Sequence, residues 1–326
     1  MTSEERLVFV VPSDEPAQIQ GSPELGRLKP YGDLVMYTDM PLTMDKQLQR
    51  VINAHVIINT GALIDWPGEI LRALPKLQMM TTSGAGTDHI DLKTASMMGV
   101  VVSNQPGQTA SVVAEHIIAM MFAVAKRIGF QTPEIKNGRW TQLFNITLRG
   151  KTLGIVGTGH VGREVAKQAK AIGMDVIAWS FHPEREWAKS LGVRYVELDT
   201  LLHQADVVSP HVRLSKQSTG MIGRREFTIM KKGAILINAS RGGVIDTYAL
   251  ADALNSGHLM GAGLDVHDPE PPPLNHPILS CINVVFTPHQ SNQTPEGIEL
   301  LNEGAVSNVL SFLKGHPQNV MTQQKK

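Results

Sequence analysis

The sequence predicts an α/β fold with two doubly wound parallel-sheet domains. Short apolar runs alternate with helical stretches, and this alternation is typical of parallel sheets covered by helices on both faces. One run, Thr152–Val156, leads into a glycine-rich turn of the dinucleotide-binding type, Gly157-Thr158-Gly159-His160-Val161-Gly162. At 326 residues the chain is also long enough for two domains.

Five apolar runs of strand length mark the N-terminal region, and we expect a buried strand at each. The runs are Leu7–Val11, Asp33–Tyr37, Val56–Asn59, Leu77–Thr81 and Val100–Ser103. The segment Ala110–Ile128 differs, because it is long, mostly apolar and free of Gly and Pro. It predicts a buried helix that links two units.

The glycine-rich turn lies in the context that dinucleotide binding requires. Three glycines at this spacing let the backbone turn tightly, approach a pyrophosphate and pack the helix against the strand. An apolar stripe of helical spacing follows the turn, and a further strand, Val176–Trp179, comes after it; the stripe is Val161, Val165, Ala169 and Ile172. The alternative is a glycine-rich turn in some other α/β protein, which would not require a strand, the turn, a helix and a second strand in this order. We expect the phosphate charge at the helix N-terminus.

The second unit contains six predicted strands, which match a complete dinucleotide fold. They are Thr152–Val156, Val176–Trp179, Asp206–Ser209, Ala234–Asn238, Gly261–Asp265 and Asn283–Phe286. A helix over Glu296–Leu313 follows, and it could return to the N-terminal domain. We therefore expect a Rossmann cofactor domain at residues 105–290, inserted into a flavodoxin-like substrate domain made of residues 1–104 and 291–326.

The composition favours a cytoplasmic protein with a small-molecule partner. The chain has 30 basic and 30 acidic side chains and a formal net charge of +0, which favours neither nucleic acid nor an anionic membrane as partner. No apolar run reaches membrane-spanning length, and we expect no signal peptide at the charged N-terminus. The lone Cys281 excludes an intrachain disulfide, and beside a predicted strand we expect it to be a small buried residue rather than a nucleophile.

Three polar residues, Arg241, Glu270 and His289, each follow a predicted strand of the second unit. Ligands of doubly wound sheets bind at the carboxyl ends of the strands. Arg241 could hold a carboxylate, His289 could donate a proton to a developing alkoxide, and Glu270 could favour the imidazolium. Taken singly, each has a plainer interpretation as a surface or phosphate contact, a solvated carboxylate or an ordinary loop residue. Their order behind a dinucleotide motif favours hydride transfer to a carbonyl.

Eight motifs extend this pattern over nearly the whole chain. They are Gly84–Asp91, Asn104–Gly107, Val113–His116, Gly154–Gly162, Ile237–Asp246, Ala262–Val266, Pro269–Pro271 and Thr287–His289. Together they resemble the D-isomer-specific 2-hydroxyacid dehydrogenases. This family includes glyoxylate/hydroxypyruvate reductases, D-lactate dehydrogenases and 3-phosphoglycerate dehydrogenase.

The resemblance implies a role for each site residue. Arg241 would bind the substrate carboxylate and carbonyl oxygen, His289 would be the general acid/base, and Glu270 would be its partner. Backbone N–H groups around Ala85 and Gly86 would hold the other side of the carboxylate. The expected cofactor contacts are Gly157, Thr158, Gly159, His160, Val161, Gly162, Ser180, His182, Arg185, His211, Ala239, Arg241, Asp265 and His289.

Two further points follow from the resemblance. Asp265 would hydrogen-bond the nicotinamide carboxamide. The family is usually dimeric, so a homodimer with contacts from the cofactor domain and Ala110–Ile128 is implied.

The acidic residue that usually closes the dinucleotide motif is absent. Ser180 stands where NAD-binding domains carry Asp or Glu for the ribose 2′-hydroxyl. Loss of that anion permits a 2′-phosphate, which Ser180, His182 and Arg185 could bind, so NADP is slightly favoured over NAD. Alternatively, the site accepts both cofactors. The plainer interpretation of Arg185 is that it pairs with Glu184 or Glu186 on a helix face.

These observations predict an NAD(P)-dependent reductase of small 2-keto acids, of the glyoxylate/hydroxypyruvate type, that forms D-2-hydroxy acids. Glu270 argues against formate, because formate dehydrogenases carry Gln there. The alternative is a cofactor-sensing corepressor-like or scaffold protein on the same fold, since such proteins can keep the same three residues. We expect substrate selection from the region Thr60–Leu63 and from the linking helix. No metal is expected, because the histidines near the motifs lack clustered ligand spacing; these are His89, His116 and His211.

Overall fold

The computed structural model describes residues 6–61 and 64–323, and these residues form two compact units. Unit 1 combines Met1–Thr109 with Gln293–Lys326, and unit 2 is Ala110–Asn292. The chain thus passes from one unit to the other a few residues after the boundaries expected at 104 and 290. Unit 2 is an insertion between the two parts of unit 1.

Unit 1 is built on a parallel sheet of five strands in the order β2-β1-β3-β4-β5, which is the flavodoxin order. The strands are β1 (Leu7–Val11), β2 (Gly32–Met36), β3 (Val56–Asn59), β4 (Met79–Thr82) and β5 (Val101–Ser103). The helices are η1 (Pro23–Leu28, a 3-10 helix), α1 (Met44–Val51), α2 (Gly68–Arg72), α3 (Leu92–Met98) and α11 (Pro295–Leu313). The five predicted strands are confirmed.

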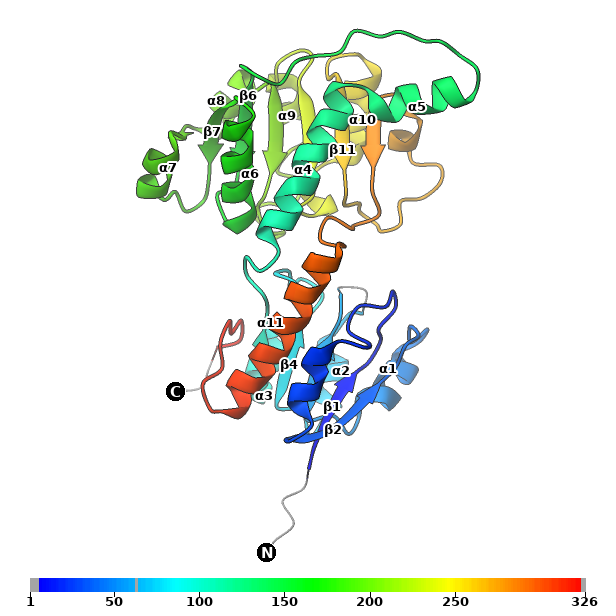
Figure 1. The fold of residues 1–326 in the computed structure, drawn as a ribbon, viewed down its shortest axis with the longest axis vertical. Helices are drawn as coiled ribbons and strands as arrows, with labels where there is room; N and C mark the ends of the chain where they lie inside the picture. The colour runs from blue at the N-terminus through cyan, green and yellow to red at the C-terminus, as the bar shows by residue number, and fades with distance from the viewer. Residues whose placement is uncertain (1–5, 62–63, 324–326) are drawn as a thin grey trace, which may run out of the picture. The chain divides into compact units, whose positions relative to one another are not determined.

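Both faces of this sheet are buried except at the edge strand β2, which explains why the inner strands show no polar alternation. Val10 and Ile57 pack in one cluster with residues of α1, α2 and α3. Their neighbours along the strands, such as Phe9 and Val56, face the other side and pack against η1 and α11. Figure 1 shows α11 running along the sheet beside β4. The predicted return of the last helix to the N-terminal domain is therefore found.

Unit 2 is built on a parallel sheet of seven strands in the order β12-β11-β10-β9-β6-β7-β8. The strands are β6 (Thr152–Val156), β7 (Asp175–Trp179), β8 (Arg194–Tyr195), β9 (Val207–Pro210), β10 (Ile235–Asn238), β11 (Gly261–Leu264) and β12 (Val284–Phe286). Counted from β6 along the chain, the first six strands follow the Rossmann order 3-2-1-4-5-6. The predicted fold class is confirmed.

Helices cover both faces of this sheet. They are α4 (Ala110–Ala125), α5 (Ile128–Lys136), α6 (His160–Ala171), α7 (Arg185–Leu191), α8 (Leu198–Gln204), α9 (Arg224–Ile229) and α10 (Thr247–Asn255), with the 3-10 helices η2 (Gly242–Val244) and η3 (Pro277–Ser280). Residues of α4 and α6 pack with Ile155 and Ile237 on one face. Residues of α8, α9 and α10 pack with Val156 and Leu236 on the other. Figure 1 shows α4 and α6 side by side over one face.

Three details of unit 2 correct the sequence-based expectations. The linking helix was expected to reach Ile128, but α4 ends at Ala125 because Arg127 adopts a left-handed conformation (φ 53°). A second helix, α5, then follows and was missed, since it carries Pro133 in its interior. The strand β8 was also missed, because two residues are too few for an apolar pattern.

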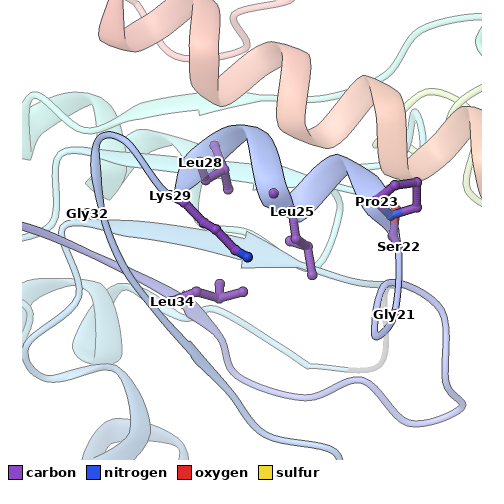
Figure 2. A pocket seen from close by; sticks show the side chains of 9 residues that line it. Gly21, Ser22, Pro23, Leu25, Leu28, Lys29, Gly32 and Leu34 are labelled. Carbon is purple, nitrogen blue, oxygen red and sulfur yellow. The ribbon is translucent and has the colours of Figure 1, made fainter.

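Three further observations concern single side chains and the surface. Cys281 is buried as expected, and burial raises the pKa of its thiol. No helix in the described part of the chain is both long and apolar enough to cross a membrane. A hollow of about 370 Å³ in unit 1 lies between η1 and β2, where Figure 2 shows Leu25, Lys29 and Leu34 around it. None of the expected site residues lines this hollow.

Candidate active site and cofactor cradle

The glycine-rich turn between β6 and α6 has the geometry of a phosphate cradle. Gly157 has φ +104°, and a Cβ there would lie 2.9 Å from Val212 Cγ1. A Cβ on Gly162 would overlap the carbonyl oxygen of Gly157. Gly159, the N-cap of α6, has open space where its Cβ would be. A phosphate group could therefore reach the first N–H groups of α6, beside His160 and Val161.

The segment after β7 is tied to this turn by the hydroxyl of Tyr195. The backbone N–H of Glu184 donates to Tyr195 Oη at 3.0 Å, and Tyr195 Oη lies 2.7 Å from Thr158 Oγ1. The Glu184 carboxylate forms an ion pair with Arg163 of α6. These contacts fix the loop that begins with Ser180.

Ser180, His182 and Arg185 all lie in or next to this loop. Ser180 Oγ accepts a hydrogen bond from the backbone N–H of His182 at 3.2 Å. The side chains of His182 and Arg185 are exposed. Within the described residues Arg185 has no ion-pair partner, and the carboxylate of Glu184 is bound to Arg163 instead. The alternative pairing of Arg185 with Glu184 is therefore not found.

His211 and Ala239 follow β9 and β10 at the same edge of the sheet. His211 Nε2 is buried and has no hydrogen-bond partner among the described residues. Burial lowers the pKa of His211 to about 3, so its ring is neutral at neutral pH. An orphaned polar atom of this kind, on a residue whose backbone approaches Gly157, fits a site that a polar ligand completes.

Asn238, the last residue of β10, shapes the turn that carries Arg241. Its Nδ2 donates to the Arg241 carbonyl oxygen at 2.9 Å, and its Oδ1 accepts from the N–H of Ser240 at 3.0 Å. Arg241 is half-buried, and its Nη1 donates to the Ser240 carbonyl oxygen at 2.9 Å. A Cβ on the next residue, Gly242, would overlap the backbone of His267. The Arg241 turn therefore packs directly on the segment that leads to Glu270.

His289 and Glu270 form the central pair of the site. His289 Nδ1 lies 2.8 Å from Glu270 Oε2, and Glu270 Oε1 accepts a hydrogen bond of 2.8 Å from the N–H of His267. Burial alone would raise the pKa of Glu270, but the hydrogen bonds from His289 and His267 outweigh it and hold this pKa below its ordinary value. Glu270 is therefore ionised at neutral pH and can stabilise a positive charge on His289.

Asp265 holds the backbone of the segment that carries His289. Its side chain is fully buried, and it accepts hydrogen bonds from Thr287 Oγ1 (2.6 Å), the N–H of Gln290 (2.9 Å) and the N–H of Ser291 (3.1 Å). Its carbonyl oxygen accepts the N–H of His289 at 2.7 Å. His289 has φ 51°, a left-handed conformation that costs a non-glycine residue on the order of 1 kcal/mol. The contacts of Asp265 hold the chain in that conformation.

Ala85 and Gly86 lie in unit 1, after β4. Gly84 supplies the turn with φ +114°, and Asn104 Nδ2 donates to the Ala85 carbonyl oxygen at 2.7 Å. In the part of the chain that the structure describes, neither the N–H of Ala85 nor that of Gly86 donates to another protein group. These donors are available to an anion, as the resemblance implies.

Several residues of this network were not singled out from the sequence. Arg163 and Tyr195 belong to no motif, and only the fold brings them to the site residues. Thr287 belongs to the motif Thr287–His289, but no role was expected for its side chain. The described residues contain no group of three or more His, Cys, Asp or Glu side chains placed to hold a metal. Of the predicted selection region Thr60–Leu63, Ala62 and Leu63 lie outside the described residues.

The comparisons with known proteins agree with this geometry. A family model described as "D-isomer specific 2-hydroxyacid dehydrogenase, NAD binding domain" matches residues 118–291. The chain is 34% identical to glyoxylate reductase of Korarchaeum cryptofilum over 310 residues, which cover 92% of each protein. It is 39% identical to D-3-phosphoglycerate dehydrogenase of Archaeoglobus fulgidus over 266 residues, which cover 80% of this chain but only 50% of that protein.

Two solved structures resemble the whole chain. D-lactate dehydrogenase from Aquifex aeolicus, complexed with NAD and lactic acid, has a TM-score of 0.83 and 29% identity, and the match covers 98% of this chain and 100% of that one. Acyclic imino acid reductase, in complex with NADPH and D-Arg, has a TM-score of 0.87 and 26% identity, with 97% and 100% covered. The relatives thus include one structure with each nicotinamide cofactor.

Proposed function

Because this chain belongs to the D-isomer-specific 2-hydroxyacid dehydrogenase family, we propose that it reduces small 2-keto acids of the glyoxylate and hydroxypyruvate type to D-2-hydroxy acids. Members of this family are oxidoreductases with a nicotinamide cofactor. The observation that carries the proposal is the 2.8 Å contact between His289 Nδ1 and Glu270 Oε2 at the carboxyl edge of the unit 2 sheet. The scaffold alternative is not favoured, since the relatives are dehydrogenases and reductases.

The pair supplies and holds the proton that the reduction consumes. Since Nδ1 of His289 faces Glu270, its Nε2 is the ring nitrogen left to donate to the substrate carbonyl oxygen. The negative charge of Glu270 stabilises the imidazolium before that transfer. Arg241 binds the substrate carboxylate and polarises the neighbouring carbonyl. The nicotinamide supplies the hydride.

The cradle fits a dinucleotide. Gly157 and Gly162 permit the tight turn, Gly159 leaves open space for the pyrophosphate, and the partnerless Nε2 of His211 supports a polar ligand near this edge of the sheet. The Asp265 carboxylate accepts three hydrogen bonds, which leaves about one of its lone pairs for the nicotinamide carboxamide.

NADPH is the favoured cofactor. Ser180 carries no charge, and the carboxylate of Glu184, which follows in the same loop, is paired with Arg163. The exposed side chains of His182 and Arg185 are available to a 2′-phosphate. A phosphate at this loop thus meets two basic groups and no unpaired acid among these residues.

The protein is proposed to act in the cytoplasm as a homodimer. In unit 2, exposed apolar side chains gather on α5 and on the extended segment that runs from it to β6, which Figure 1 shows in green. They are Ile128, Ile135, Trp140 and Phe144. Trp140 is 80% exposed and is thus not a core residue. Light scattering of the wild type and of the double variant W140S/F144S should show a dimer and a monomer, respectively.

Rates with glyoxylate, hydroxypyruvate, pyruvate and phenylpyruvate, each with NADH and NADPH, test the proposed reaction. We expect turnover with the first two acids and a preference for NADPH. A preference for NADH would keep the reaction and overturn the role of Ser180, His182 and Arg185. If none of the eight pairs of acid and cofactor gives turnover while a cofactor still binds, the scaffold alternative would be favoured.

A further inference from the structure

His116 lies on α4, outside the three residues that touch the substrate in the proposed reaction. Its side chain is 21% exposed, and its Nε2 lies 3.1 Å from Thr287 Oγ1 and 3.6 Å from Asp265 Oδ1. All three residues belong to unit 2. A helix on one face of the sheet thus contacts the segment between β12 and His289.

The direction of these hydrogen bonds follows from proton counting. Asp265 accepts on Oδ1 from Thr287, whose hydroxyl has a single proton to donate. Toward His116 the same hydroxyl can only accept. His116 must therefore carry a proton on Nε2, and the chain of donors runs from His116 to Thr287 to Asp265.

This chain ends at the backbone of the His289 turn. The Asp265 carboxylate accepts the N–H groups of Gln290 and Ser291, on the C-terminal side of His289. Thr287, on its N-terminal side, donates through its hydroxyl, and its own N–H donates to the Leu264 carbonyl oxygen at 3.0 Å. Rotation of the Asp265 carboxylate would remove hydrogen-bond acceptors on both sides of His289. The left-handed backbone of His289 is intrinsically unfavourable, so it depends on these contacts.

We propose that His116 is a positioning residue for His289: it orients Thr287 and through it Asp265, and so holds the left-handed turn that aims the imidazole. The inference rests on the proposed function for its kinetic consequence. His116 takes no part in proton transfer, because the protons of this chain all point toward Asp265 and none toward His289 Nε2.

Kinetics of four variants test the proposal. His116→Phe keeps a ring but removes the donor, His116→Gln keeps a donor, and Thr287→Val removes the relay hydroxyl at constant shape. His258→Phe is the matched control, because His258 is also half-buried in unit 2 and its Nε2 contacts a backbone carbonyl oxygen, that of Met230, at 3.0 Å. The full chain is used throughout, and kcat is corrected for the folded fraction.

We expect H116F and T287V to lower kcat about tenfold or more, since small misplacements of a catalytic group cost that much. KM for the 2-keto acid should change by less than about threefold, because Arg241, which binds the substrate carboxylate, remains in place. H116Q should recover most of the lost kcat. Wild-type kcat in H116F, equal losses in H116Q and H116F, or an equal loss in H258F would each overturn the proposal.

A spectroscopic measurement tests the same arrangement without substrate. In ¹⁵N–¹H correlation spectra of histidine-labelled protein, the signals absent from H116Q belong to His116 and should show its proton on Nε2. The signals absent from H289A belong to His289 and should shift in T287V. A proton on Nδ1 alone, or His289 signals unchanged in T287V, would overturn the proposal. If no 2-keto acid is turned over but these shifts are found, the proposed function fails while the positioning of His289 stands.

Discussion

The two ends of the site in unit 2 lie at the carboxyl edge of one sheet, yet they are held in different ways. At the reaction end, the fully buried carboxylate of Asp265 accepts three hydrogen bonds around His289. At the end proposed to bind the adenosine, the Ser180 loop is held by one tyrosine hydroxyl and by the ion pair of Arg163 and Glu184, whose side chains are 29% and 60% exposed. Buried polar networks are costly to disturb, whereas exposed ion pairs contribute little.

This difference suggests that the two ends respond differently to substitution. The reaction end needs one imidazole in one orientation, so its supporting groups are buried and connected. The adenosine end needs only to accept or repel a charge, so exposed single residues can set the preference. The following predictions test whether the two ends respond independently to substitution.

The largest effect is expected from His289→Ala. Loss of a general acid lowers kcat by about 10²–10⁴-fold. The cofactor Kd, measured by fluorescence titration, should stay within about twofold, because the cradle lies at β6 and β7. The control H258A should leave both values unchanged. Retained turnover in H289A would remove His289 from the reaction.

A smaller effect, confined to the other end, is expected from Ser180→Asp. The added carboxylate would repel a 2′-phosphate and accept a ribose hydroxyl, so the ratio of kcat/KM for NADPH to that for NADH should fall about tenfold or more. Ser180→Asn, similar in size but uncharged, is the control and should keep most of the preference. An unchanged ratio in S180D would show that the 2′-position does not lie at this loop.

A still smaller effect is expected from Tyr195→Phe. The variant loses the hydroxyl that joins Thr158 to the N–H of Glu184, at a cost of about 1 kcal/mol in the free energy of unfolding. KM for NADPH should rise a few-fold, since the loop loosens, while kcat stays unchanged. A large fall in kcat would contradict the independence of the two ends. Urea titration and steady-state kinetics measure both quantities.

The smallest effect concerns stability and pH at the reaction end. The pKa of Glu270 is held below its ordinary value of 4.5, so the ionised Glu270 carboxylate stabilises the fold above that pH, and its contribution is lost as pH falls further. The Tm difference between wild type and Glu270→Gln should therefore shrink between pH 6 and pH 3.5. Because the pair is about one-third exposed, the change should be at most about 2 °C. A Tm difference that grows toward low pH would contradict the stabilising role of the ionised Glu270 carboxylate.

The sequence predicted the sheets and the glycine turn well, because their signals are local. Buried parallel strands are apolar runs, and a glycine turn that must approach a phosphate has few other solutions. The break at Arg127 and the helix α5 were not predictable, since a left-handed arginine and an internal proline oppose the local preferences.

The site divides in the same way. Arg241, Glu270 and His289 follow strands and carry motifs, so they could be named from sequence, and the structure brings Glu270 and His289 into contact. The pairing of Arg163 with Glu184 and the contact of His116 with Thr287 join segments that are distant in sequence. Such contacts depend on the tertiary fold, and no local sequence pattern predicts them.

The close approach of Gly242 to the His267 backbone bears on how this protein could be re-engineered. Any side chain at 242 would separate the Arg241 turn from the segment that leads to Glu270, so a random library across this turn would contain mostly inactive members. A directed-evolution campaign for new substrates would therefore fix glycine at 242 and diversify elsewhere. The fraction of active clones at position 242, compared with that at Gly26, an exposed glycine with open space at its Cβ and no positive φ, would measure how narrow this constraint is.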